Sequence, residues 1–309
     1  MKTQSGVGSS DRETVSKFRF DGILDGSSQD EVYETVARDV VSHVITGHNG
    51  TIFCYGQTGA GKTYTMTGNP GLFEHRGITP RAISQLFQEI QARTAHSYTV
   101  RASYLEIYND NIVDLLAATQ PESLSIVTED GVTSVKGLSM EAVTSEEEAL
   151  ATFFRGEQAR TNARHGQNES SSRSHCVFTV TLEATDVGGR QTQPLLSKIN
   201  LVDLAGSERA KKANATGDQM MEAQYINKSL SFLEQVVQAL VKRSAHVPFR
   251  QSKLTAVLRD ALGGNSRAAM IANIWPEKDN VEEISVRLVG GVNVGHDLCE
   301  CHRRSKALT

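Results

Sequence analysis

The stretch GQTGAGKT, residues 56–63, combines glycines, a lysine and a threonine at a spacing that can hold phosphate groups. Glycines let the backbone wrap closely, so that successive N–H groups face phosphate oxygens. The backbone that would form this cradle comprises Gly56, Gln57, Thr58, Gly59, Ala60 and Gly61. Lys62 adds a charge for the terminal phosphates, the Thr63 hydroxyl can bind Mg²⁺, and the helix expected next adds its positive end. The pattern predicts nucleotide binding. The alternative is a plain glycine-rich turn, and chance produces the full pattern in such a chain on the order of 1% of the time.

A second candidate for phosphate chemistry is the acid that ends the apolar run INLVDLAGSE, residues 199–208. Hydrolysis needs a second metal contact, a positioned water and a sensor of the γ-phosphate. Asp203 can hold the Mg²⁺ shell through water, and the N–H of Gly206 can approach the γ-phosphate because no side chain blocks it. The alternative is an ordinary strand that ends in an acidic turn.

A third candidate is NESSSRSH, residues 168–175, in which hydroxyl and amide groups flank one arginine. Taken alone, such a run is typical of a solvated loop or a phosphorylation site.

Apolar periodicity predicts the elements that position these three segments. A buried strand at 51–55 precedes the phosphate loop. Other strands are expected at 17–20, 98–107, 176–182, 197–204 and 268–274, and helices at 30–45, 80–93, 145–159, 221–242 and 251–262. Strands alternate with helices, and no linker or repeat divides the chain. We therefore expect a single three-layer α/β domain with a mixed central sheet and the phosphate loop at the carboxyl end of a central strand.

The composition limits the partners that the chain can take. The net charge of the 309 residues is −4, so the chain as a whole is not expected to bind nucleic acid, and an acidic partner must meet a local basic patch. The four cysteines suit a reducing compartment. The polar start has no apolar core for a signal peptide, and no stretch approaches a membrane span. These observations favour a cytoplasmic protein without a membrane partner.

The three segments together resemble the motor domain of a kinesin. GQTGAGKTYTMTG resembles the phosphate loop of that family, NESSSRSH its first switch and LVDLAGSE its second. Other similar stretches are SYLEIYNDNIVDLL, YINKSLSFLEQVVQAL and HVPFRQSKLTAVLRDALGGNSRAAMIANIWP. The likeness runs from about Phe18 to Pro276, and SLSFLEQ, with Glu234, resembles the ciliary and flagellar branch. It implies a kinesin-type P-loop NTPase that hydrolyses ATP with Mg²⁺, is stimulated by microtubules and acts on the cytoskeleton, in the cytoplasm or in a cilium or flagellum.

The resemblance also implies roles for residues of the two switches: Asn168, Ser171, Ser172, Arg173 and Glu208. Ser172 would bind Mg²⁺, Ser171 and Ser172 would position the attacking water, and Asn168 would orient the first switch. Arg173 and Glu208 would form the ion pair that closes the pocket, and Glu208 would pass a proton through water. A guanidinium can meet a carboxylate with two hydrogen bonds, so this closure has one defined geometry. Tyr64 matches the position whose ring packs on adenine.

The filament-binding surface implied by the resemblance requires clustered cations, because tubulin is acidic. The candidates are Lys242, Arg243, Arg250, Lys253, Arg259 and Arg267, with Lys211 and Lys212 after the second switch. Asp260 is the single acid between residues 242 and 267. Release of the γ-phosphate from Gly206 would shift the helix at 221–242 and change filament affinity. The alternative for such a charge run is a solvated face.

Both ends of the chain depart from the family pattern. Residues 1–16 are expected to be disordered, and nothing in residues 1–17 matches the Arg-x-Arg-Pro-like first strand that packs on adenine. We therefore expect a motor domain at 17–288 that lacks this strand, and an atypical tail at 289–309 without neck linker or coiled-coil heptads. Such a chain would be a monomer that binds microtubules without stepping. The alternative function is a nucleotide-dependent microtubule adaptor without significant ATPase activity. A signalling GTPase is disfavoured because the sequence contains no Asn-Lys-x-Asp-like motif for recognition of the guanine base.

Overall fold

The computed structural model describes residues 20–129, 132–165, 173–188, 193–207, 218–263, 266–274 and 299–303. Its strands are β1 (Gly22–Asp25), β2 (Asn49–Gly56), β3 (His96–Tyr108), β4 (Asn111–Asp114), β5 (Ser125–Glu129), β6 (Val132–Lys136), β7 (Glu141–Ala142), β8 (His175–Asp186), β9 (Leu195–Asp203), β10 (Ser266–Ile274) and β11 (Cys299–Arg303). Its α-helices are α1 (Gln29–Val32), α2 (Arg38–Ile45), α3 (Lys62–Met66), α4 (Ile78–Ala92), α5 (Glu146–His165), α6 (Asp218–Val241), α7 (Lys253–Val257) and α8 (Arg259–Gly263). A π-helical turn, η1 (Tyr33–Ala37), joins α1 to α2, and 3₁₀ turns lie at η2 (Phe73–His75) and η4 (Phe249–Gln251).

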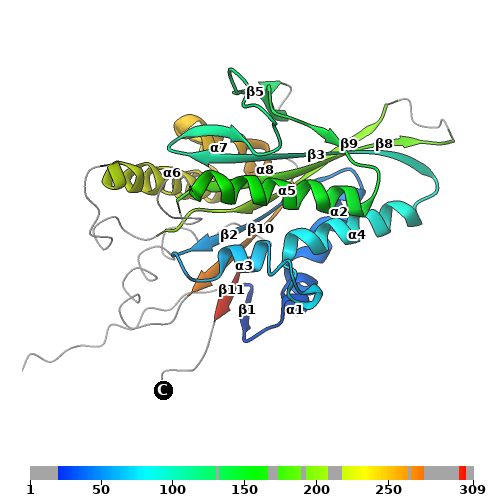
Figure 1. Ribbon diagram of the computed structural model, residues 1–309, viewed down its shortest axis with the longest axis horizontal. Helices are drawn as coiled ribbons and strands as arrows, with labels where there is room; N and C mark the ends of the chain where they lie inside the picture. Colours follow the sequence, from blue (N-terminus) through cyan, green and yellow to red (C-terminus); the bar gives the residue numbers. More distant parts are fainter. Residues whose placement is uncertain are drawn as a thin grey trace, which may run out of the picture.

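A nine-stranded mixed sheet runs through the middle of the fold (Figure 1). Its order is β1-β11-β10-β2-β9-β8-β3-β4, and β7 pairs with β3. From β1 to β9 the neighbouring strands are parallel, and from β9 to β4 they are antiparallel. Strand β2 therefore has parallel neighbours on both sides, and the loops that follow β2 and β9 meet at the same edge of the sheet.

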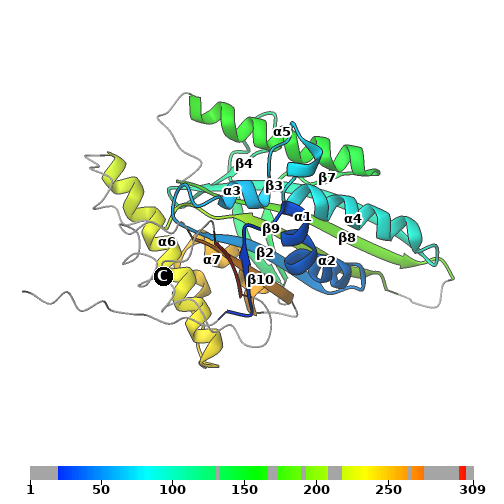
Figure 2. The ribbon, with the colours of Figure 1, turned by 90° about the horizontal axis from the view of Figure 1, so that it is seen from below.

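Helices cover both faces of this sheet, as Figure 2 shows with α5 on one side and α6 on the other. One apolar core joins the sheet to α2 and α4 through residues such as Val40 and Leu86. A second core joins the opposite face to α6, α7 and α8 through Leu230, Leu254 and Ala261. The expected three-layer α/β fold with a mixed sheet is confirmed. In the described part of the chain, no helix is long and apolar enough to span a bilayer.

Most of the expected long elements are confirmed, with two differences in the helices. The helix expected at 30–45 buries Val32, Val36, Val40 and Val44 as its four-residue spacing predicts, but it contains the π-helical turn η1. The helix expected at 251–262 is divided into α7 and α8 by a turn at Leu258. Ser252 begins α7 with a capping box, in which the side chains of Ser252 and Thr255 each accept from the backbone N–H of the other.

The strand β11 lies within the sheet, where the sequence predicted none. It pairs in parallel with β1 on one side and with β10 on the other. The sequence predicts a tail outside the motor domain at residues 289–309 and a sheet that lacks one strand. In the structure Cys299–Arg303 occupy a place between β1 and β10, so the sheet is continuous there. The other segments expected near the ends, at 1–19 and 275–298, lie outside the described residues.

Candidate active site

The phosphate loop connects the buried strand β2 to the short helix α3. Gly61, the residue before α3, has a φ of 95°, a left-handed conformation that favours glycine. A Cβ atom on Gly56 would lie 2.2 Å from the carbonyl oxygen of Asn273, so only glycine lets the loop pass this close to β10. The spacing of glycines in the sequence is therefore explained by backbone geometry at this loop.

Lys62, the residue predicted to bind the terminal phosphates, is buried within the phosphate loop. Its Nζ donates hydrogen bonds to the carbonyl oxygens of Gly56, at 2.9 Å, and Gln57, at 2.8 Å. Carbonyl oxygens are weaker acceptors for an ammonium group than phosphate oxygens, because a charged acceptor makes the stronger bond. The loop thus holds the lysine at the place where a phosphate would meet it.

The end of β9 is tied to the loop by two contacts. The Thr63 hydroxyl donates to Oδ2 of Asp203 at 2.8 Å, and the Ser207 N–H donates to the Gly56 carbonyl at 3.0 Å. Thr63 and Asp203, both predicted metal ligands, therefore lie together although 140 residues separate them. Gly206 lies between the two contacts in sequence, which places it next to the phosphate loop.

Arg160 of α5 is a site residue that no sequence motif predicted. Its side chain is 1% exposed, and its Nη1 lies 3.0 Å from Oδ2 of Asp203 and 3.6 Å from Oε1 of Glu157. Glu157 in turn accepts from the hydroxyls of Tyr104 and Thr67. The guanidinium thus holds Oδ2 of Asp203, the same carboxylate oxygen to which the Thr63 hydroxyl donates. No short motif signals Arg160, because its partner is 43 residues away and its surroundings in the sequence are polar.

Three buried side-chain oxygens around the phosphate loop have no hydrogen-bond partner among the described residues: Gln57 Oε1, Asp203 Oδ1 and Asn273 Oδ1. Buried polar atoms are normally paired, so each of these oxygens is suited to a bound group or water. Mg²⁺ prefers oxygen ligands and keeps several waters. The Thr63 hydroxyl and the open oxygen of Asp203 fit such an ion, with Asp203 acting through water.

The side of the site expected to meet the base contains Tyr64, which is 40% exposed. Its hydroxyl is 3.0 Å from Nδ1 of His75, and its carbonyl oxygen accepts from Nε2 of Gln29 at 2.7 Å. Gln29, at the start of α1, was not predicted by the sequence. It fixes the backbone of Tyr64 relative to α1, and the ring is left accessible for stacking.

The predicted switch residues are only partly described. Arg173 lies just before β8, and Gly206 and Ser207 follow β9. The remaining residues predicted in the switches and after them lie outside the described residues: Asn168, Ser171, Ser172, Glu208, Lys211 and Lys212. The ion pair expected between Arg173 and Glu208 therefore stays a prediction.

His175, the last residue of NESSSRSH, is buried where the two switch segments meet. Its Nδ1 accepts from the N–H of Ala205 at 3.1 Å, and its Nε2 is 2.7 Å from the Ser229 hydroxyl on α6. Burial lowers the pKa of His175 to about 3, and the nearby positive charges of Lys62 and Arg160 act in the same direction. The ring is therefore neutral at physiological pH.

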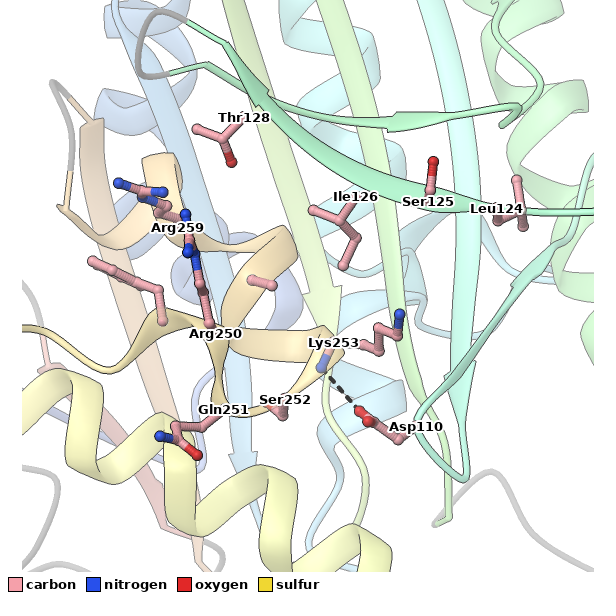
Figure 3. Close-up of a pocket in the computed structure, with 12 residues that line it drawn as sticks. Asp110, Leu124, Ser125, Ile126, Thr128, Arg250, Gln251, Ser252, Lys253 and Arg259 are labelled. Carbon is pink, nitrogen blue, oxygen red and sulfur yellow. Dashed lines mark hydrogen bonds between the residues drawn. The ribbon is translucent and has the colours of Figure 1, made fainter.

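Three of the predicted filament-binding cations line one cavity of about 500 Å³ (Figure 3). Arg250, Lys253 and Arg259 line it together with residues of β5 such as Ile126 and Thr128. Asp110 also lines the cavity, and its Oδ1 accepts from the backbone N–H of Lys253 at 2.9 Å. The side chains of all three cations line the same wall, formed by η4, α7 and α8.

The other predicted cations of this stretch lie elsewhere. Lys242 and Arg243 directly follow α6. Arg267 differs, because it lies beside α2 with Nη2 at 3.7 Å from Oδ2 of Asp39 and Nη1 at 3.0 Å from Nδ1 of His43. Since α2 covers the face of the sheet opposite to α7 and α8, Arg267 is separate from the cavity that Arg250, Lys253 and Arg259 line.

Comparison with known proteins gives one consistent result. A family model described as the kinesin motor domain matches residues 2–288. Kinesin-like protein KLP1 of Chlamydomonas reinhardtii is 54% identical over 269 residues, which are 86% of this chain and 35% of that protein. Kinesin-like protein KIF9 of Mus musculus is 50% identical over 279 residues, which are 88% of this chain and 35% of that protein. The chain thus spans about a third of the length of these relatives.

A solved structure of a fast kinesin also matches this fold. It has a TM-score of 0.78 and 40% sequence identity, and the match covers 86% of this chain and 75% of that one. The sequence and the fold therefore agree on the same family of proteins.

Proposed function

This chain belongs to the kinesin motor domain family, and on that premise we propose that it is a microtubule-binding ATPase that hydrolyses ATP with Mg²⁺ and couples hydrolysis to its affinity for microtubules. The observation that carries the proposal is the phosphate loop, which is joined through Thr63 to Asp203 and through Gly56 to Ser207. These two contacts join the phosphate loop to the segment that contains Gly206, the proposed sensor of the γ-phosphate, so a change at the phosphates can reach that segment.

Binding of the ATP phosphates is assigned to residues 56–63. Backbone N–H groups of the loop would face the phosphate oxygens, and Lys62 would exchange its bonds to Gly56 and Gln57 for bonds to the terminal phosphates. Tyr64 would stack on the base. Because the lysine is already buried at the loop, phosphate binding should cost little additional side-chain entropy.

Mg²⁺, when bound, would supply positive charge that neutralises negative charge on the phosphates. The Thr63 hydroxyl and Ser172 would hold it directly, and Asp203 would hold it through water. Arg160 keeps the Asp203 carboxylate in place through Oδ2, the oxygen that Thr63 also contacts. This arrangement leaves one oxygen of Asp203 to accept from a metal-bound water.

Hydrolysis is assigned to the two switches by family likeness. Ser171 and Ser172 would position the attacking water, and Asn168 would orient the first switch. Arg173 and Glu208 would pair when the γ-phosphate is present, and Glu208 would carry a proton away through water. The N–H of Gly206 would sense the γ-phosphate. Its place between Asp203 and Ser207, both tied to the phosphate loop, supports this role.

The proposed microtubule surface comprises Arg250, Lys253 and Arg259 around the cavity, Lys242 and Arg243 after α6, and Lys211 and Lys212. Its contacts are between charges near the surface, so its affinity is expected to fall steeply as salt rises, because the Debye length is about 8 Å at physiological ionic strength. We also propose the cytoplasmic cytoskeleton, including cilia or flagella, as the site of action, because SLSFLEQ resembles the ciliary and flagellar branch.

Steady-state ATPase activity with and without microtubules tests the proposal. The double variant Arg250→Ala/Lys253→Ala should keep the activity measured without microtubules and lose most of the stimulation. Arg38→Ala is the matched control, because Arg38 is also an exposed cation but lies on the opposite face and pairs with Glu34. Nucleotide-dependent microtubule binding without turnover would instead support the adaptor function. Absence of both binding and turnover would refute both functions.

A further inference from the structure

We propose that His175 is a positioning residue that links the loop after β9 to α6 and thereby transmits the state of the phosphate site to that helix. The inference rests on the proposed function, because α6 leads into the proposed microtubule surface at Lys242 and Arg243. The proposed link is a single path of hydrogen bonds, which runs from the backbone N–H of Ala205 through the His175 ring to the Ser229 hydroxyl.

The direction of each hydrogen bond on this path is fixed. The Ala205 backbone N–H can only donate, so Nδ1 of His175 must be the acceptor. The proton of the neutral ring is therefore on Nε2, which donates to the Ser229 hydroxyl at 2.7 Å. The Ser229 hydroxyl donates in turn to the Ile226 carbonyl one turn earlier, at 2.8 Å. The donor and the acceptor of each hydrogen bond are therefore fixed, and exchanging them would leave a buried polar atom unpaired.

One end of the path is attached to the phosphate site. Ala205 lies two residues after Asp203, which Thr63 and Arg160 contact, and two residues before Ser207, which donates to Gly56. The segment at 203–207 is thus held to the phosphate loop on both sides of Ala205. A shift of this segment when the γ-phosphate is bound or lost must move the Ala205 N–H.

The other end of the path is on the face of α6 that packs against the sheet. Ile226, Leu230 and Leu233 of this face share an apolar cluster with Leu204 and Ala205. Apolar contacts of this kind hold the helix to the sheet but are not directional, so they tolerate small sliding. A hydrogen bond to a buried ring is directional. The hydrogen bond can therefore set the position of α6 relative to the loop after β9, while the apolar cluster keeps the helix packed against the sheet.

The test compares Ser229→Ala with Ser231→Ala in the full chain. Ser229→Ala removes the acceptor of the His175 Nε2–H, whereas Ser231 is an exposed serine on the same helix. His175→Asn is the second variant, because its amide oxygen can keep the bond to Ala205 while losing Ser229. Ser229→Thr keeps the hydroxyl and should behave as wild type.

The first readout is the ratio of microtubule affinities measured with a non-hydrolysable ATP analogue and with ADP. A net hydrogen bond is worth about 0.5–1.5 kcal/mol, so Ser229→Ala and His175→Asn should bring this ratio closer to one by about two- to tenfold. Ser231→Ala should leave it unchanged. An unchanged ratio in both link variants, or equal weakening in both nucleotide states, would show a merely structural role and overturn the inference.

The second readout needs no microtubules. Hydrogen exchange of the amides of residues 226–241 is compared between the ATP analogue and ADP, and the wild-type difference should disappear in Ser229→Ala and His175→Asn. If wild type does not bind microtubules, the proposed function fails and this readout alone decides the inference. A wild-type α6 whose exchange ignores the nucleotide, or link variants that keep the full response, would overturn it.

Discussion

Replacement of Arg160 by methionine should destabilise the protein strongly, because Arg160 is a buried cation between two carboxylates. Its side chain is 1% exposed, and those of Asp203 and Glu157 are 6% and 18% exposed. Methionine has similar length but no charge. The substitution therefore leaves two carboxylates near each other in a site with little water.

The size of the effect follows from this burial. Removal of one partner from a buried ion pair costs about 3–5 kcal/mol, because the other charge remains buried without compensation. For a domain of this size, 1 kcal/mol corresponds to about 2–4 °C in melting temperature, so Arg160→Met should lower it by about 6–20 °C. Arg160→Lys keeps the charge but lacks the guanidinium fork, so we expect a smaller loss.

Chemical denaturation and thermal melts of the variants measure this loss. Arg38→Met is the matched control, because Arg38 pairs with Glu34 at 2.7 Å but is 54% exposed, and exposed pairs contribute about 0–1 kcal/mol. If Arg160→Met were as mild as Arg38→Met, the buried arrangement around Asp203 would be wrong.

Four further predictions concern the site, the sheet and pH. Glu208→Ala should keep ATP binding and lose nearly all hydrolysis, because Glu208 is assigned to the water and the closing ion pair; a variant that kept most of its turnover would contradict that role. The sequence predicts no adenine-packing strand in residues 1–17, so ATP and GTP affinities should differ by less than about tenfold, or 1.4 kcal/mol, and titration with both nucleotides measures this. Deletion of residues 299–309 should lower the melting temperature by several degrees, since β11 pairs with both β1 and β10, whereas deletion of 304–309 should not. The pKa of His175 is lowered from 6.5 to about 3, so its contribution to stability is complete above pH 6.5 and is lost as pH falls toward 3. Stability measured between pH 4 and 7 should therefore fall less steeply for His175→Asn than for wild type.

Local sequence signals were sufficient where function depends on the backbone. The phosphate loop needs glycine at Gly61 because of its left-handed backbone and at Gly56 because the loop passes close to the Asn273 carbonyl of β10, and the glycine spacing signalled both positions. The acid at the end of β9 was recognisable because an apolar strand ending in a carboxylate places it at the sheet edge. The contact between Thr63 and Asp203 then follows from the parallel pairing of β2 with β9.

Residues whose partners are distant in sequence could not be predicted in this way. Arg160 belongs to a polar helix and looks like a solvated residue until the fold brings it to Asp203. His175 belongs to the NESSSRSH motif, but no role was predicted for it, because its partners Ala205 and Ser229 lie 30 and 54 residues away. Strand β11 has no apolar alternation, and it is defined only by its two neighbours in the sheet.

An acidic filament should repel a chain with a net charge of −4, so the proposed contact requires a surface region where positive charge prevails. The positions of the acidic residues in the structure create such a region. Asp260, the single acid between residues 242 and 267, is buried, and its Oδ2 lies 2.7 Å from Nζ of Lys198. Arg250 and Arg259 have no ion-pair partner within the described ranges, whereas Arg267 of the same stretch pairs with Asp39 on the other face.

The cations between residues 242 and 267 form one basic run in the sequence, but in the fold they lie on different faces of the sheet. Lys198 neutralises the one acid of the run inside the protein, and Arg267 is neutralised on the opposite face. The positive charge that remains is concentrated at the cavity lined by Arg250, Lys253 and Arg259, and their three charges outnumber that of Asp110, the one acid among the lining residues described. Since the field that attracts a partner depends on local charge more than on the total, a chain that is acidic overall can still bind an acidic surface there. Lys198→Met should therefore weaken microtubule binding even though the Lys198 side chain is only 15% exposed, because it would leave the charge of Asp260 uncompensated next to Arg259 of the cavity wall.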